Sequence, residues 1–191
     1  MEYGFIFDYD GVLMESMETH YKANVIALSE INVPMDKKKF FSQAGMTGVE
    51  QVKSFCDDAG VTADYKAIHE RKKQIFKTMM HEVKRIERNL ELYNILLSSG
   101  AKIAVATGCS RETLEMTSKL LDITIPVSVC GGDVKRGKPH PDLFLEAARL
   151  IGLKPNKCTV IEDSDVGIEA AKAAGMACMR YYKEKDEENG I

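Results

Sequence analysis

Short apolar runs alternate with longer amphipathic stretches through most of the chain. The apolar runs predict strands because glycine, proline or polar residues bound them, and they fall at residues 3–7, 102–107, 127–130, 159–161 and 177–181. The stretches after residue 88 predict helices, at residues 91–99, 111–121, 141–151 and 166–174. Alternation of this kind predicts an α/β fold with a parallel sheet covered by helices on both faces.

Residues from about 14 to 85 depart from this alternation directly after the first strand. They contain no convincing strand, and their amphipathic stretches predict helices at residues 18–31, 49–56 and 64–83. We therefore expect a helical insertion that leaves and rejoins the sheet domain near the end of the first strand. One interpretation gives it a role at the functional site, and the alternative is a subdomain that only packs against the rest.

Polar side chains gather where the predicted strands end. Five of them directly follow or end an apolar run: Asp8, Asp10, Thr107, Glu162 and Asp163. Lys138 stands in a loop ahead of a predicted helix. Aspartate, serine and threonine also cap helices, and lysines are mostly solvated, so each has an ordinary explanation alone. Ligands of open α/β sheets bind beyond the carboxyl ends of the strands, so the set predicts a functional site there.

Asp8 and Asp10 need something nearby to offset their repulsion. Two like charges about 4 Å apart repel by ~1 kcal/mol in bulk water and by ~4 kcal/mol at an effective dielectric of 20. A divalent cation, a shared proton or a lysine would each provide the offset, and the residues alone do not choose among them.

Composition limits the classes of partner. The 191 residues include 29% charged side chains with a formal net charge of −3, which argues against a nucleic-acid surface or a polybasic membrane anchor. No apolar run approaches the roughly 18 residues of a membrane span, and the N-terminus enters a strand without a signal-like region. The five cysteines lack a C-x-x-C spacing, which favours reduced thiols in a cytoplasmic protein. A monomer is the default expectation.

Four segments together resemble the motifs of the haloacid dehalogenase superfamily, in its branch of small-molecule phosphatases and phosphomutases. They read F-D-Y-D-G-V-L, A-T-G-C-S, G-K-P-H-P-D and I-E-D-S-D-V-G-I-E-A-A, in this order. The resemblance implies a Rossmann-like core with a parallel sheet flanked by helices, plus an inserted all-helical cap. Residues 1–13 and 86–182 would form the core, residues 14–85 the cap and residues 183–191 a charged tail.

The resemblance also implies roles for the acids. Asp8 matches the family nucleophile, which would form an aspartyl-phosphate, and Asp10 matches the general acid and base. The implied cofactor is Mg²⁺, which prefers oxygen ligands. Its ligands would be the Asp8 carboxylate, the Asp10 main-chain carbonyl and Asp163. Glu162 would act through a water molecule, or alternatively would cap a helix or support the ligands from behind.

The remaining motif residues match positions that hold the phosphoryl group. Thr107 should hydrogen-bond a phosphoryl oxygen, helped by main-chain N–H groups at Gly108 and the helix start that follows. Lys138 should pair with both the phosphoryl group and Asp8, which keeps the nucleophile ionised.

The implied reaction is hydrolysis of a small phosphorylated metabolite, with a sugar monophosphate as the expected substrate. Dehalogenases of the superfamily lack the second aspartate of the first motif, so Asp10 argues against that chemistry. The first alternative is β-phosphoglucomutase, because His20 and Lys72 fall where that enzyme has a hinge histidine and a substrate-contacting lysine. His20 is equally explained as a satisfied helix histidine. Gly48 stands where the mutase has an arginine that grips a second phosphate, which weakens this alternative.

A second alternative, from a different class, is a catalytically silent binding protein. Its warrant would be a missing motif residue, and the chain retains all of them.

Overall fold

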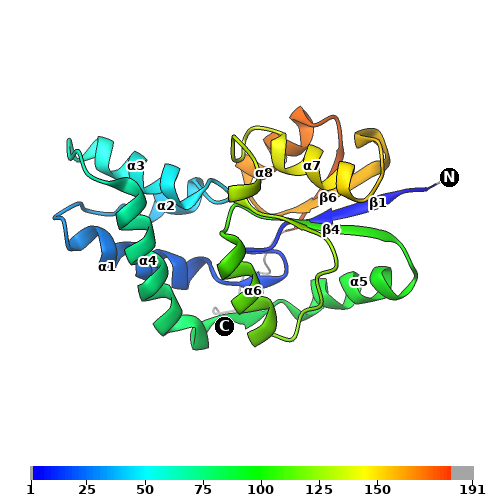
Figure 1. Ribbon diagram of the computed structural model, residues 1–191, viewed down its shortest axis with the longest axis horizontal. Helices are drawn as coiled ribbons and strands as arrows, with labels where there is room; N and C mark the ends of the chain where they lie inside the picture. Colours follow the sequence, from blue (N-terminus) through cyan, green and yellow to red (C-terminus); the bar gives the residue numbers. More distant parts are fainter. Residues whose placement is uncertain (1, 182–191) are drawn as a thin grey trace, which may run out of the picture.

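The computed structural model describes residues 2–181, so the expected tail at residues 183–191 lies outside the described part. Its centre is a parallel sheet of five strands, each joined to its neighbour in parallel register (Figure 1). In spatial order they are β5 (Ser128–Val129), β4 (Lys102–Ala106), β1 (Gly4–Phe7), β6 (Cys158–Glu162) and β7 (Ala177–Arg180). The predicted parallel sheet is confirmed.

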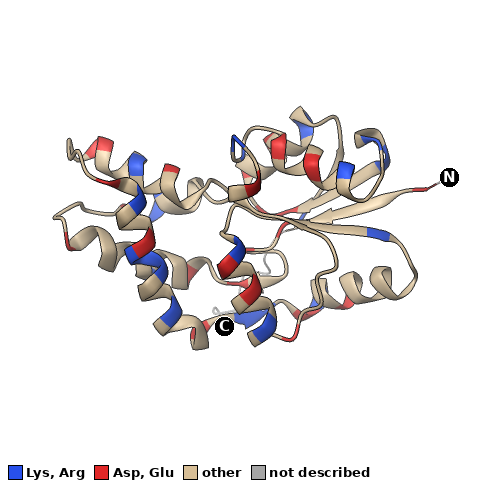
Figure 2. Cartoon of the chain, in the orientation of Figure 1, with Lys and Arg blue, Asp and Glu red and all other residues tan. Residues whose placement is uncertain are grey.

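The two faces of the sheet bury two separate apolar clusters. Phe7 points into one cluster, where its ring meets Tyr93 edge-on at 5.2 Å between ring centroids, and Ile6 points into the other. This follows from the period of two along a strand. Helices α5 (Glu87–Ser98) and α6 (Arg111–Leu120) contribute to the first cluster, and α7 (Asp142–Leu150) and α8 (Asp165–Ala173) to the second. Figure 2 shows that charged positions lie mainly on helices and loops.

The segment after β1 forms a helical cap beside the carboxyl edge of the sheet (Figure 1). We use "cap" for helices α1 (Met17–Ser29), α2 (Lys37–Ser42), α3 (Gly48–Asp58) and α4 (Tyr65–Met79). The expected helix at residues 64–83 ends earlier, at Met79, and a short 3-10 turn follows at Met80–Glu82.

Helix α2 was not expected from the sequence. Its start is set by Asp36, whose side chain accepts a hydrogen bond from the Lys39 N–H at 2.6 Å and so caps the helix. Phe40 is the residue of α2 that is buried, and its ring lies 5.5 Å from that of Tyr21 on α1, between ring centroids. A six-residue helix with one buried position is too short to show a helical period in the sequence.

The expectation that residues 14–85 lack a strand is wrong at both ends of that segment. Strand β2 (Met14–Glu15) pairs antiparallel with β3 (Lys84–Arg85), and the Ile86 N–H donates to the Leu13 carbonyl at 3.1 Å. Two-residue strands are too short to show a period of two in the sequence. They form only because the segment that leaves the sheet domain meets the segment that returns to it. This pairing ties together the two points at which the chain leaves and rejoins the sheet domain.

Two further findings concern the whole described part of the chain. None of the helices within residues 2–181 combines the length and apolar character that a bilayer span requires. All five cysteines carry free thiols. The strand ends that carry Asp8, Thr107 and Asp163 lie at one edge of the sheet, facing the cap, because β1, β4 and β6 are parallel neighbours.

Candidate active site

Asp8 and Lys138 form a buried ion pair at the centre of this edge. Asp8 directly follows β1, and its N–H donates to the Ile161 carbonyl at 2.9 Å, which extends the sheet by one residue. Lys138 Nζ lies 2.5 Å from Asp8 Oδ1 and 2.8 Å from Glu162 Oε2. Burial works against charge on Lys138, but the two carboxylates outweigh it and raise its pKa. The lysine is therefore charged at neutral pH.

Three acids surround this one lysine. Asp8, Glu162 and Asp163 each offer an oxygen atom, and these atoms lie within 4.8 Å of one another. Burial raises the pKa of Asp8 well above its usual range, with a further contribution from Glu162 that Lys138 only partly offsets. Burial and Glu162 likewise raise the pKa of Asp163 to about 7. The cluster therefore holds more carboxylates than one lysine neutralises.

An oxygen-ligated divalent cation fits this donor set. The described residues provide Asp163 with no hydrogen bond from another side chain, so its carboxylate is available to a cation. Glu162 differs, because its Oε1 accepts from the N–H and hydroxyl of Ser164, at 3.1 and 2.5 Å, and its Oε2 accepts from Lys138. Mg²⁺ prefers one or two carboxylates together with water and phosphate oxygens. The occupied oxygens of Glu162 favour an indirect role for this residue.

Gly11 makes room for the Asp163 carboxylate. A Cβ atom built at Gly11 would overlap the Asp163 side chain, with its Cγ atom 2.8 Å away. Gly11 also has φ +91°, a conformation that favours glycine over residues with a side chain. The glycine that follows the two aspartates is thus required both by the turn and by the close approach of the third acid.

Asp10 turns away from the acid cluster and towards the cap. Its Oδ1 accepts a hydrogen bond from the Ser16 hydroxyl at 2.5 Å and lies 3.1 Å from His20 Nε2. Lys72 Nζ lies 2.8 Å from His20 Nδ1. An ammonium group can only donate, so Nδ1 of the neutral imidazole accepts from Lys72 and Nε2–H donates to Asp10. A chain of three polar groups therefore connects the core, α1 and α4.

Burial acts on every group of this chain. It would raise the pKa of Asp10, but the hydrogen bonds from His20 and Ser16 outweigh it, so the pKa is lowered. Burial and the charge of Lys72 lower the pKa of His20. Burial also lowers the pKa of Lys72 to about 8. The ring of His20 stacks on Phe76, with 4.1 Å between ring centroids.

The environments of Asp8 and Asp10 push their pKa values apart, as their expected division of roles requires. A nucleophile needs its carboxylate ionised and a general acid needs its carboxyl protonated. The shifts run the other way, since the pKa of Asp8 is raised and that of Asp10 is lowered. Two charges that the chain does not itself supply would reverse both directions. A cation beside Asp8 favours its ionised form, and the negative charge of a phosphoryl group favours a proton on Asp10.

Thr107 and Gly108 close the site from the end of β4. The Thr107 hydroxyl donates to Asp10 Oδ2 at 3.3 Å and accepts from the Cys109 N–H at 3.1 Å. A Cβ atom at Gly108 would lie 2.9 Å from the carbonyl oxygens of Gly45 and Met46. Glycine is needed there because the loop between α2 and α3 rests on it.

The comparisons with known proteins agree with this geometry. Residues 5–181 match the family described as haloacid dehalogenase-like hydrolase. The chain belongs to this family. A phosphorylated carbohydrates phosphatase from Thermotoga maritima is 31% identical over 177 residues, covering 90% of this chain and 81% of that protein. A β-phosphoglucomutase from Bacillus subtilis is 28% identical, covering 90% of this chain and 79% of that protein.

Solved structures show the same fold. A hydrolase from Pseudomonas syringae superimposes with a TM-score of 0.85 at 29% identity, covering 93% of this chain and 83% of that one. The chain matches a smaller share, 17%, of one longer relative, the SUPPRESSOR OF QUENCHING 1 protein of Arabidopsis thaliana. The predictions of a haloacid dehalogenase-like fold with a helical cap, and of an enzyme of the family's phosphatase kind, are confirmed.

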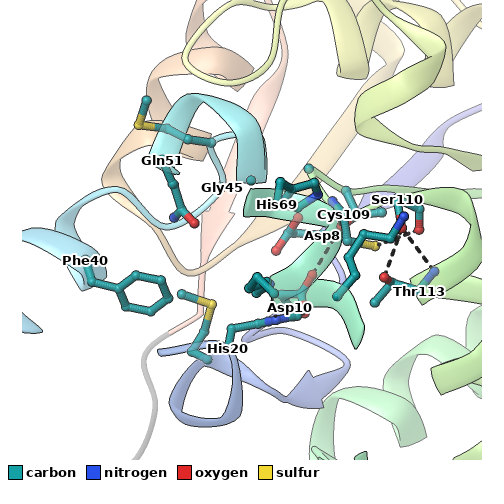
Figure 3. Close-up of a pocket in the computed structure, with 17 residues that line it drawn as sticks. Asp8, Asp10, His20, Phe40, Gly45, Gln51, His69, Cys109, Ser110 and Thr113 are labelled. Carbon is teal, nitrogen blue, oxygen red and sulfur yellow. Dashed lines mark hydrogen bonds and ion pairs between the residues drawn. The ribbon is translucent and has the colours of Figure 1, made fainter. Parts of the chain in front are cut away.

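In this haloacid dehalogenase-like hydrolase, core and cap line one pocket (Figure 3). Of the residues predicted for the site, six line it directly: Asp8, Asp10, His20, Lys72, Thr107 and Gly108. Lys138, Glu162 and Asp163 do not line this pocket. Lys138 contacts both Asp8 and Glu162, and Asp163 offers an oxygen within 4.8 Å of those two acids.

Sequence reasoning missed several polar residues of the hydrolase site. Ser16 reads as an ordinary helix cap, yet its hydroxyl bonds Asp10. Gln51 and His69 carry no motif, but both line the pocket from α3 and α4. Cys109 lies beside Thr107, and burial raises the pKa of its thiol well above the usual range, which disfavours the reactive thiolate.

Proposed function

We propose that the protein is a Mg²⁺-dependent phosphatase that hydrolyses a small phosphorylated metabolite, a sugar monophosphate, through an aspartyl-phosphate on Asp8. The observation that carries this proposal is the buried contact of Lys138 with Asp8 and Glu162, next to Asp163. It places a lysine cation against the Asp8 carboxylate at the edge of a pocket, with a second carboxylate, Asp10, two residues away.

The reaction divides into two displacements at phosphorus. In the first, Asp8 forms a bond to phosphorus, the ester P–O bond breaks, and Asp10 gives its proton to the departing oxygen. In the second, Asp10 takes a proton from water, the water oxygen bonds to phosphorus, and the bond to Asp8 breaks. Inorganic phosphate leaves and both aspartates return to their starting state.

The cation would be held by the Asp8 carboxylate, the Asp10 main-chain carbonyl and Asp163, with Glu162 acting through water. When bound, it neutralises the negative charge that the acids and the phosphoryl group bring together. The protein supplies further neutralisation from Lys138. Thr107 and the main-chain N–H groups from Gly108 onward offer hydrogen bonds to phosphoryl oxygens.

His20 and Lys72 act from the cap. The contact of His20 with Asp10 exists only while α1 lies against the core, and the contact of Lys72 with His20 joins α4 to α1. We propose that residues 1–13 and 86–182 form the catalytic core and residues 14–85 the cap, with the β2–β3 pair as the connection. Closing such a cap excludes water and completes the site around the leaving group.

β-Phosphoglucomutase activity is the second candidate, favoured by the same His20 and Lys72 contacts and by the similarity to the Bacillus subtilis enzyme. A mutase must hold a second phosphate on the same sugar, and glycine at position 48 offers it no guanidinium. We therefore rank hydrolysis first.

The five free thiols also support a reducing, cytoplasmic setting as part of the proposal.

One experiment separates the two candidates. The purified protein is incubated with a panel of sugar monophosphates and p-nitrophenyl phosphate, with Mg²⁺ or with chelator, and released phosphate is measured. We expect phosphate release that requires Mg²⁺ and is lost in Asp8→Asn. Conversion of β-glucose 1-phosphate into glucose 6-phosphate without phosphate release would identify the mutase instead.

A further inference from the structure

His69 is a pocket residue with an unsatisfied imidazole. It lies on α4 one turn before Lys72 and lines the cap side of the pocket (Figure 3). Its Nδ1 atom is buried and has no hydrogen-bond partner. Its Nε2 atom also lacks a hydrogen bond to any described residue, but unlike Nδ1 it is not buried. The ring therefore has one accessible nitrogen that can serve a ligand.

Gly48 explains why the ring can lie where it does. A Cβ atom built at Gly48 would overlap the His69 ring, with Nε2 3.1 Å away and both Cε1 and Nδ1 closer than that. Gly48 is the first residue of α3 and does not have a positive φ, so its backbone conformation does not demand glycine. The ring demands it, because any side chain at position 48 must displace the imidazole.

The cations beside His69 already have partners. Lys72 Nζ contacts His20, and Lys73 Nζ lies 2.8 Å from Glu70 and 3.3 Å from Glu112. Burial and the charges of Lys72 and Lys73 lower the pKa of His69 to about 4, so its ring is neutral at pH 7. The cap side of the pocket thus offers a neutral hydrogen-bonding group at the place where the glycine leaves no room for a cation.

We propose that His69, whose ring packs against Gly48, determines substrate specificity by hydrogen-bonding a hydroxyl of the leaving group through Nε2. The preferred substrate class is then a phosphate monoester with one phosphate and an uncharged, hydroxylated leaving group, rather than a bisphosphate or a phosphorylated carboxylic acid. This inference rests on the proposed phosphatase function and adds His69 as the residue that recognises the leaving group.

The first test replaces His69 by Phe, which keeps a ring against Gly48 and removes both nitrogens. Loss of one neutral hydrogen bond should lower kcat/KM by about 3- to 10-fold. The loss should appear for the best hydroxylated substrate among fructose 1-phosphate, sorbitol 6-phosphate and glucose 6-phosphate. This loss should exceed any change in the value for p-nitrophenyl phosphate, whose leaving group has no other hydroxyl. His69→Gln, which can still donate a hydrogen bond, should recover part of the loss.

The second test leaves His69 unchanged and fills the space that Gly48 provides for its ring. Gly48→Ala should displace the ring and reproduce the selective loss on the hydroxylated ester. In a His69→Ala background the same Gly48→Ala change should cost less than 2-fold, because no ring remains to displace. This coupling distinguishes a contact between the two residues from two independent effects.

The outcomes separate this inference from the proposed function. Equal losses on the sugar ester and on p-nitrophenyl phosphate, or no loss on the sugar ester, would overturn the role of His69 while leaving phosphatase activity intact. A faster reaction of the unchanged protein with fructose 1,6-bisphosphate or phosphoglycolate than with the neutral esters would overturn the substrate class. If the unchanged protein hydrolysed none of these esters, the proposed function would be wrong and the inference would fall with it.

Discussion

Lys138 Nζ lies 2.5 Å from Asp8 Oδ1 in a fully buried contact between residues 130 positions apart in the chain. The same ammonium group reaches Glu162 at 2.8 Å. One lysine thus connects the end of β1 with the end of β6 and places its charge where the acids of the site converge.

Lys138→Met should remove most activity and destabilise the fold. The change leaves buried carboxylates without their cation, and loss of one partner of a buried pair costs roughly 3–5 kcal/mol. We expect kcat to fall about 10²- to 10³-fold, measured with p-nitrophenyl phosphate, and Tm to fall as well. Lys135→Met is the matched control, because Lys135 is exposed in the same loop. Retention of more than about a tenth of the activity would argue against an essential Lys138.

Asp163→Asn should weaken the dependence on Mg²⁺ more than it affects the fold. The variant keeps the shape of the side chain but loses the charge of a proposed ligand, so half-maximal activity should need about 10-fold more Mg²⁺ or beyond. Asp165→Asn is the control, since Asp165 is exposed and pairs with Arg180. Identical Mg²⁺ titrations for the two variants would exclude Asp163 as a ligand.

His69 should make stability depend on pH between about 4 and 6.5. Its folded-state pKa is lowered to about 4, while an unfolded histidine titrates near 6.5. The unfolded chain therefore binds more protons in this window, so the free energy of unfolding falls as the pH falls.

His69→Phe should remove this contribution, which we expect to be about 1–3 kcal/mol between pH 7 and pH 4. Urea denaturation of both proteins at several pH values measures it. If the free energy of unfolding depended on pH in the same way in both proteins, the pKa of His69 would not be lowered by folding.

Glu112 joins the cap to the core from outside the pocket. Its carboxylate, on α6, lies 2.6 Å from Lys77 Nζ and 3.3 Å from Lys73 Nζ on α4. Exposed pairs contribute only about 0.2–1 kcal/mol each, so Glu112→Gln should lower kcat/KM by about 2- to 5-fold, with the difference disappearing at high salt. Glu115→Gln, an exposed change one turn away on the same helix, should have no such effect. A salt-independent loss would refute an electrostatic contact.

The parts of the fold that could be predicted are those in which local sequence carries the signal. Strand β1 is an apolar run, and its polar end places Asp8 at the edge of the sheet because parallel strands share that edge. Lys138 was predicted to meet Asp8 from its motif, and the structure brings the two together.

The parts that could not be predicted arise from contacts between distant segments. Strands β2 and β3 form only because the segment that leaves the sheet domain pairs with the segment that returns to it. Gly48 could be seen as a departure from a motif, but the ring of His69 that fills its side-chain space lies 21 positions away on another helix and carries no pattern of its own. Single-sequence periodicity contains no information on such approaches.

The most direct test of the account traps the phosphorylated residue. The protein is mixed with p-nitrophenyl phosphate and Mg²⁺, quenched during turnover and reduced with borohydride, which converts an acyl phosphate on aspartate to homoserine. Peptide mass spectrometry then locates the change. We expect homoserine at position 8, and none there in Asp8→Asn or without substrate. Turnover with an unmodified Asp8, or modification of a different residue, would contradict it.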